Sequence, residues 1–236
     1  MHLSWRRGSD EGRSQNPRLR KDFATLPGLG HLYNRPCMEP HQLGRLVEKA
    51  RKGDRDAFQA IYEHFVKRIY NFLFRMVGSA HEAEDLTQQT FLHALQQLGT
   101  LRNIKQIESW MYRIARNEAY QKFRRKGEDL LDDGDVDLRI ERLREVRIHA
   151  QPDKSLMNLE LREVIQKVLD SLPTKLREVF VLAVIQGMSY QEIAIVVGRS
   201  LVSVKTDVYR ARLLVKEDLR KYLGPQSASA SVGKKR

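Results

Sequence analysis

The sequence contains almost no cysteine and no long apolar run, and both absences exclude classes of protein. Cys37 is the single cysteine in 236 residues, so the chain can form neither a disulfide framework nor a cysteine-built zinc site. No apolar run reaches the roughly 18–20 residues that a membrane helix needs. Arg6 and Arg7 are not followed by the apolar segment of a secretory signal. We therefore expect an intracellular, cytoplasmic protein without membrane insertion.

Motifs of catalysis and of metal binding are also missing from the sequence. It has no P-loop, no G-x-S-x-G and no zinc spacing, and its seven histidines form no ligand pattern. The acidic cluster at residues 132–137 lacks the glycine and the final glutamate of an EF-hand loop. We predict that the protein is not an enzyme and has no catalytic residues, metal, cofactor or small-molecule substrate. An enzyme that acts on nucleic acid through acidic residues and a metal is a weaker alternative.

What the sequence has in excess is positive charge. Lysine and arginine number 42 against 30 aspartates and glutamates, which gives a formal net charge of +12. A charge of this size indicates a polyanionic partner, either nucleic acid or an anionic membrane surface. A generally basic protein without such a partner is the simpler alternative.

The apolar residues divide the chain into two helical domains with polar segments around them. Residues 1–40 are rich in Gly, Pro, Ser and Arg without any period, which is typical of a disordered basic extension. Helical spacing runs through 41–127, an acidic linker follows at 128–158, and helical spacing returns at 159–223. The Ser/Ala-rich tail 224–236 is again expected to be disordered. The predicted fold is all-α, with two small domains joined by an acidic flexible linker.

Two interpretations of the N-terminal segment stay open. Met38 begins a more ordered stretch, so it is either the true start of the protein or the end of a genuine flexible basic arm. Mass spectrometry of the native protein separates the two, because a mature N-terminus at Met1 contradicts the first.

Three amphipathic helices are predicted in the first domain. The first carries apolar residues at three- and four-residue spacing and ends at Gly78. Ser79 and Glu82 form a capping-box pattern for the second, and the third has Trp110 in its apolar stripe. Four residues are expected to continue the buried face of the second helix: Phe91, Ala94, Leu95 and Leu98.

A helix-turn-helix is predicted near the C-terminus. Ser189 and Glu192 form another capping-box pattern, Gly198 supplies a turn, and Ser200 can cap the helix that follows. In such a motif the second helix enters the major groove of duplex DNA, although an ordinary helical hairpin with a charged outer face is the alternative. The inner face of that helix is expected at Val204, Val208 and Ala211. The residues predicted to contact duplex DNA are Arg199, Ser200, Ser203, Lys205, Thr206, Tyr209, Arg210 and Arg212.

A basic segment of the first domain, residues 102–126, also has the composition of a nucleic-acid surface. Tyr112, Tyr120 and Phe123 are interleaved there with lysines and arginines. Cations that bind phosphates and aromatic rings that stack on bases are the usual means of binding single-stranded DNA. Trp110 belongs instead to the apolar stripe of the core. The run at 124–126 alternatively only complements the dipole of a helix C-terminus.

Several segments resemble the extracytoplasmic-function (ECF) sigma factors of bacterial RNA polymerase. Residues 53–58, 83–92 and 109–117 are similar to the second conserved region of that family. Residues 172–180 and 187–212 are similar to its fourth region. Together these segments cover about residues 44–223, in the order and spacing of the family.

The resemblance implies an alternative sigma factor that binds core RNA polymerase and directs transcription from particular promoters. The polymerase set implied by it is Asp85, Gln88, Gln89 and Phe91. The minus-ten set, implied to bind the melted strand, is Arg102, Asn103, Lys105, Arg113, Asn117, Tyr120, Gln121, Arg124 and Arg125. The helix-turn-helix residues given above become the minus-thirty-five set, which reads the promoter duplex.

Further partners and processes follow from the resemblance alone. Many members of the family are held inactive by an anti-sigma factor at the inner membrane and respond to stress, so the same is expected here. The acidic linker would thread through the polymerase toward the RNA path, unless it is only a solvated spacer.

This chain departs from the family pattern at three positions within the implied sites. Gln121 stands where the family usually has Asp, Val202 where it has Gly, and Asp207 where it has Arg. Asp207 would repel phosphates unless it pairs with Arg210 or accepts from a cytosine amino group. A free-standing helix-turn-helix regulator is the rival interpretation, although such a regulator has no need of the block at 83–92.

Overall fold

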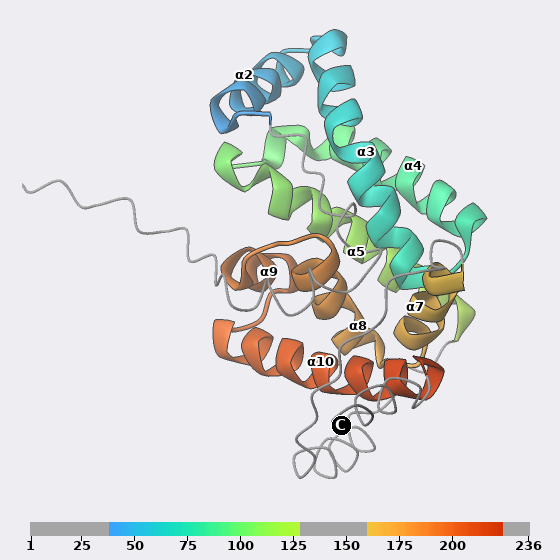
Figure 1. The fold of residues 1–236 in the computed structure, drawn as a ribbon. Helices are drawn as coiled ribbons and strands as arrows, with labels where there is room; N and C mark the ends of the chain where they lie inside the picture. The colour runs from blue at the N-terminus through green and yellow to red at the C-terminus, as the bar shows by residue number, and fades with distance from the viewer. Residues whose placement is uncertain (1–37, 128–159, 224–236) are drawn as a thin grey trace, which may run out of the picture.

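The described part of the chain is built from helices that form two groups along the sequence. The computed structural model describes residues 38–127 and 160–223 (Figure 1). Every regular element in these two ranges is helical, which confirms the all-α prediction. The predictions for the N-terminal extension, for the acidic linker and for the tail lie outside the described residues.

The first group consists of four α-helices and two short 3₁₀ turns. Sequence signals mark the ends of its longest helix, where the Asp54 carboxylate accepts the amide of Ala57 at 3.0 Å and Gly78 adopts a φ of 75°. Only glycine takes that left-handed conformation at little cost. The elements are α2 Pro40–Arg51, α3 Arg55–Val77, α4 Ala80–Gln97, η2 Leu98–Thr100, η3 Ile104–Gln106 and α5 Ile107–Lys126.

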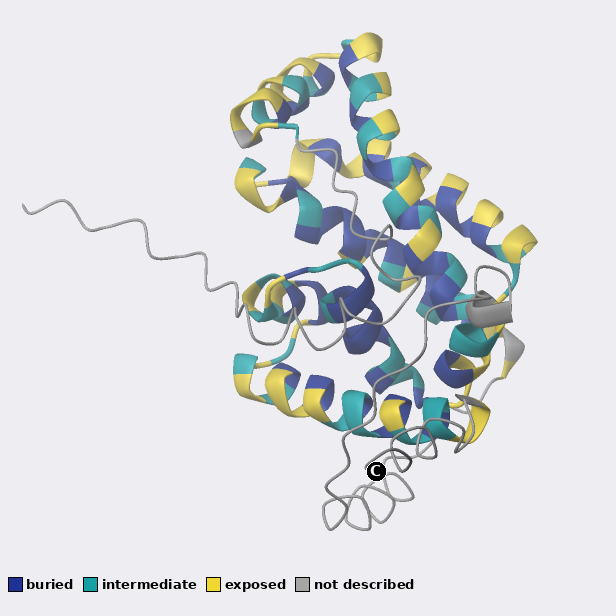
Figure 2. Ribbon diagram, viewed as in Figure 1, coloured by how far each residue is buried: buried dark blue, intermediate teal, exposed yellow. Residues whose placement is uncertain are grey.

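The core of this group lies where α3, α4 and α5 face one another (Figure 2). Phe65, Phe72 and Tyr112 are fully buried there, and the rings of Phe72 and Tyr112 meet edge to face with centroids 5.5 Å apart. Trp110 is buried as predicted. The same packing fixes the orientation of α5, and therefore decides which of its basic side chains reach solvent.

The second group contains the predicted helix-turn-helix. Ser189 and Glu192 form the complete capping box at the start of its first helix, with bonds of 3.2 and 2.7 Å. Gly198 makes the turn with a φ of 67°, and Val204 and Val208 face inward with no exposed surface. The elements are α7 Glu160–Asp170, α8 Thr174–Phe180, η4 Val181–Ile185, α9 Tyr190–Val197 and α10 Leu201–Leu223.

The helix predicted before the helix-turn-helix differs from the prediction in its last turns. The sequence predicts a single helix from Thr174 to Gln186, but Val181–Ile185 winds as a π-helix after α8. The amide of Gln186 donates to the carbonyl of Val181 at 2.9 Å, five residues earlier. The wider turn brings Gln186 to the side of α5, where its amide oxygen accepts the Tyr112 hydroxyl at 2.7 Å.

The two groups lie against each other along several helices (Figure 1). α9 packs on α5, while α7 and α8 contact α3. Arg177 on α8 donates to the carbonyl of Met76 at 2.7 Å, and Arg75 on α3 donates to Gln166 on α7 at 3.1 Å. Across both described ranges, no helix has the length and apolar character needed to cross a membrane, and no three His, Cys, Asp or Glu side chains gather as a metal site.

Candidate nucleic-acid interface

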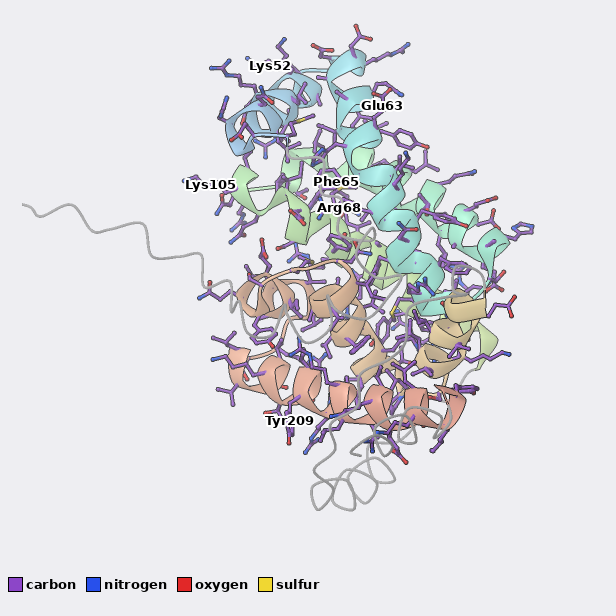
Figure 3. The ribbon with its side chains drawn as sticks, in the orientation of Figure 1. Lys52, Glu63, Phe65, Arg68, Lys105 and Tyr209 are labelled. Atoms are coloured by element: carbon purple, nitrogen blue, oxygen red, sulfur yellow. The ribbon has the colours of Figure 1, made fainter. Side chains whose placement is uncertain are left out.

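The first half of α10 presents an exposed ridge away from the rest of the fold. Val202, Lys205, Thr206 and Tyr209 are all exposed, and Tyr209 points outward from the edge of the molecule (Figure 3). The amide of Ser203 donates to the Ser200 hydroxyl at 3.2 Å, so Ser200 caps the helix as predicted. The ridge therefore begins at a capped helix N-terminus, where a recognition helix meets base edges.

Three other members of the minus-thirty-five set lie beside this ridge and are less accessible. Ser203, Arg210 and Arg212 are half-buried. A long arginine side chain can still extend its guanidinium past a half-buried stem. Lys205, Thr206 and Tyr209 are therefore the members of the set with the freest access to a ligand.

Arg199, predicted as a DNA contact, is engaged within the protein in this structure. Its guanidinium donates to the Glu178 carboxylate at 2.8 Å and also pairs with Asp207. Both carboxylates are buried, and a buried carboxylate strongly retains a cationic partner because it is costly to leave unpaired. Arg199 thus holds the turn of the motif to α8 and α10.

Asp207 consequently faces the interior and not the ridge. Its predicted pairing with Arg210, and the alternative contact with a cytosine, are both replaced by the ion pair with Arg199. The sequence contains a signal of this inward orientation. An acidic residue on a basic helix, where the family usually has Arg, needs a cationic partner, and Arg199 lies eight residues before Asp207.

Most members of the minus-ten set are exposed, in the loop before α5 and on α5 itself. Arg102, Asn103 and Lys105 are exposed in the loop before α5, and Asn103 accepts the amide of Lys105 at 3.1 Å. Lys105 projects from this loop at the edge of the fold (Figure 3). On α5 itself the exposed members are Arg113, Asn117, Arg124 and Arg125, with Gln121 half-buried among them. Their spacing of four, four and three residues from 113 to 124 places them on one helix face.

The aromatic residues of α5 are less accessible than the sequence predicts. Tyr112 and Phe123 are buried in the core, because their positions on the helix turn them toward its packed sides. Tyr120 is half-buried, with the Arg116 guanidinium 4.2 Å from its ring centroid. Burial raises the pKa of the Tyr120 phenol, and the negative charge of Glu178 raises it further. Tyr120 is thus the one aromatic residue of the segment with exposed surface, and its ring is in contact with Arg116.

Glu178 connects the two groups of helices. Its side chain is 1% exposed, and its second oxygen accepts the Nε of Arg116 on α5 at 2.7 Å. One carboxylate therefore holds Arg116 from the first group and Arg199 from the second. Sequence reasoning missed this cluster, because no local pattern connects residues 62 positions apart.

The polymerase set on α4 is exposed except for its apolar member. Asp85, Gln88 and Gln89 are exposed, whereas Phe91 is buried and packs edge to face on Tyr62 with ring centroids 4.7 Å apart. The predicted placement of Phe91 on the buried face is confirmed, so this member of the polymerase set offers little exposed surface to a partner. Leu95, expected on that buried face, is instead 51% exposed.

Two leucines supply the apolar surface that Phe91 does not. Leu92 and Leu95 are 59% and 51% exposed and lie three residues apart on α4. Together with Asp85, Gln88 and Gln89 they form the α4 outer face. A helical count from Gln88 to Leu92 and Leu95 would have found them in the sequence.

Models of two protein families match the two groups of helices. Sigma-70 region 2 matches residues 61–128, and Sigma-70, region 4 matches residues 162–215. Among curated proteins, the chain is 32% identical over 181 residues to the ECF RNA polymerase sigma factor SigW of Bacillus subtilis. That match covers 74% of this chain and 95% of the relative.

Two solved structures of similar fold are complexes with a bound partner. The sigma factor RpoE in complex with the anti-sigma factor NepR from Bartonella quintana aligns with a TM-score of 0.52 and 25% identity, over 69% of this chain and 96% of that one. CnrH in complex with the cytosolic domain of CnrY aligns with a TM-score of 0.55 and 24% identity, over 75% of this chain and 97% of that one.

Proposed function

The chain belongs to the ECF sigma factors of the sigma-70 family, and from this we propose which of its surfaces select a promoter. As an alternative sigma factor, it binds core RNA polymerase and directs promoter-specific transcription initiation. Its relatives are initiation factors, so we propose that the polymerase supplies the chemistry and that this chain supplies positioning. The observation that carries the proposal is the exposed ridge on the capped first half of α10.

In the proposed mechanism, α10 first sets the position of the protein on the minus-thirty-five duplex. Lys205 at the ridge attracts phosphate, while Thr206 and Tyr209 lie where base edges are reached. The buried ion pairs of Arg199 hold the turn before α10, so the helix enters the groove in a fixed orientation.

The minus-ten set then retains the strand that opens. Asn117 has amide donors and acceptors for the edge of an unpaired base, and the arginines at 113 and 124 flank it on the same exposed face. Unstacking costs a few kcal/mol, and contacts made only with the single strand offset that cost. The set therefore favours the melted promoter over the duplex.

The α4 outer face is the proposed contact with core polymerase. Two exposed leucines beside Asp85, Gln88 and Gln89 have the composition of an apolar interface centre with a polar rim. We also propose an anti-sigma partner, supported by the RpoE–NepR complex to which this fold is similar. A cytoplasmic location is proposed as well, because core RNA polymerase is the proposed partner.

Replacing Lys205 with alanine is expected to weaken promoter binding at every sequence to a similar degree. Lys205 is exposed on the ridge and faces phosphates in the proposal, so its loss should reduce the slope of log affinity against log salt by about 1. The measurement is a salt titration of holoenzyme on a promoter fragment. The control Lys167→Ala removes an exposed lysine from α7 and should leave the slope unchanged. If Lys205→Ala also leaves the slope unchanged, the proposed docking is contradicted.

Replacing Asn117 with alanine is expected to impair strand opening more than duplex binding. Its side chain is proposed to bind an unpaired base, so the fraction of open complex should fall by about five- to tenfold, the loss of roughly one hydrogen bond of 1–1.5 kcal/mol. Permanganate reactivity of minus-ten thymines measures opening, and filter binding measures closed complex. Asn71→Ala, an exposed asparagine on α3, is the matched control. Equal losses in both assays would count against the minus-ten assignment.

A further inference from the structure

Val202 is an exposed apolar side chain at the N-terminal end of the ridge. It is 74% exposed, more than any other large apolar residue in the described ranges. It is the second residue of α10, two positions after the Ser200 cap. A β-branched residue at a helix surface does not favour helix formation. We therefore consider whether the Val202 side chain contacts a ligand.

Thr206 adds a second apolar group to the same place. Its hydroxyl donates to the carbonyl of Val202 at 3.1 Å, so the polar atom is bonded back onto the helix. Thr206 is exposed and lies four residues after Val202, which places the two side chains one above the other on one face. With its hydroxyl engaged, Thr206 presents its methyl group to a ligand.

The surroundings of this methyl pair are those of a DNA surface. Lys205 lies beside it, and the nearest acidic residue of the helix, Asp207, is turned inward and paired with Arg199. N-terminal residues of a recognition helix contact base edges in the major groove. The apolar group that base pairs present there is the 5-methyl of thymine.

We infer that Val202 and Thr206 read thymine by its 5-methyl group in the minus-thirty-five duplex. The inference rests on the proposed function and deepens it by naming what the ridge recognises. Each thymine methyl removed from water on contact favours the correct base by several-fold.

Uracil substitution tests the inference without altering the protein. Holoenzyme is first given a library of duplexes to identify its minus-thirty-five element, and each thymine in that element is then replaced by deoxyuridine, which removes only the methyl. We expect one or two positions at which uracil weakens binding about fourfold each, the effect of roughly one buried methyl group. No effect at any thymine, or an element without thymine, overturns the inference.

Variants assign the effect to the two side chains. With Val202→Ala the penalty for uracil at one of those positions should fall below twofold. Thr206→Val keeps the methyl and should bind as the native protein does, whereas Thr206→Ser keeps the hydroxyl and should bind more weakly. The reverse order for Thr206 means that its hydroxyl is the reading group and contradicts the inference.

Failure of the inference and failure of the proposed function give different results. If holoenzyme initiates at discrete promoters that are insensitive to uracil, the function stands and the methyl contact is wrong. If no discrete initiation occurs, the proposed function fails and the contact fails with it. Because the uracil series uses native protein, a folding defect in a variant cannot produce either result.

Discussion

Replacing both exposed leucines of α4 with aspartate is expected to abolish stable binding to core RNA polymerase. Leu92 and Leu95 are 59% and 51% exposed on the α4 outer face, and burying an apolar side chain of this kind in an interface contributes roughly 1.5 kcal/mol or more each. An aspartate adds a charge that must lose its water in the complex. A fall in affinity of at least about a hundredfold should follow, measured by fluorescence anisotropy of the labelled protein with core enzyme.

The control for this double variant is Tyr222→Asp. Tyr222 is an exposed aromatic residue near the end of α10, away from α4. This control tests whether replacing an exposed apolar residue elsewhere with aspartate also lowers the affinity for core enzyme. Wild-type affinity in the leucine variant, with its helical content intact, would remove α4 from the polymerase contact.

The second large effect, a decrease in the free energy of unfolding, is expected from Glu178→Gln. The substitution keeps the shape of the side chain but leaves Arg116 and Arg199 facing a neutral group in place of a carboxylate. Breaking a buried ion pair by removing one partner costs about 3–5 kcal/mol. Because both arginine side chains are 21% exposed, we expect about 3 kcal/mol, the lower end of that range. Urea denaturation, followed by circular dichroism, measures the loss.

A matched variant separates this cluster from a general effect of lost charge. Glu163→Gln replaces an exposed glutamate of α7 and should change the free energy of unfolding by less than about 0.5 kcal/mol. A similarly small change in Glu178→Gln would mean that the carboxylate does not hold the two groups of helices together. Reduced cooperativity of unfolding in that variant is the further expected sign, because Glu178 connects α8 to α5.

The helices themselves could be predicted from the sequence, because their signals are local. Gly78 and Gly198 end helices in the left-handed conformation, and Ser189 with Glu192 caps α9 through both expected bonds. The inner face of α10 follows from a spacing of three and four residues. Each of these features depends on residues within about one or two turns of each other.

Features that depend on the packing of one group on the other could not be predicted in the same way. Tyr112 was expected at a DNA surface, yet its hydroxyl donates to Gln186, 74 residues away. Arg199 was expected to contact DNA and is instead held by two buried carboxylates. An arginine in a basic helical segment is equally compatible with phosphate or with a buried acid, and only the fold decides between them.

On α4, the helical period in the sequence does indicate which residues are exposed, but the predicted faces do not follow it at every position. Phe91 follows Thr87 by four residues and precedes Ala94 by three, so it shares their buried stripe. Leu95 follows Leu92 by three and shares its exposed face. A motif assigned by resemblance identifies a segment, whereas the helical period within that segment decides which residues a partner can reach.

The central claim, that this chain selects promoters for RNA polymerase, is tested most directly by transcription with purified components. The protein is mixed with bacterial core polymerase and genomic promoter fragments, and RNA 5′ ends are mapped. We predict a stable complex and initiation at discrete sites where core enzyme alone is silent. Sequence-specific DNA binding by the protein alone, without binding to core enzyme, would contradict the claim and favour a free-standing regulator.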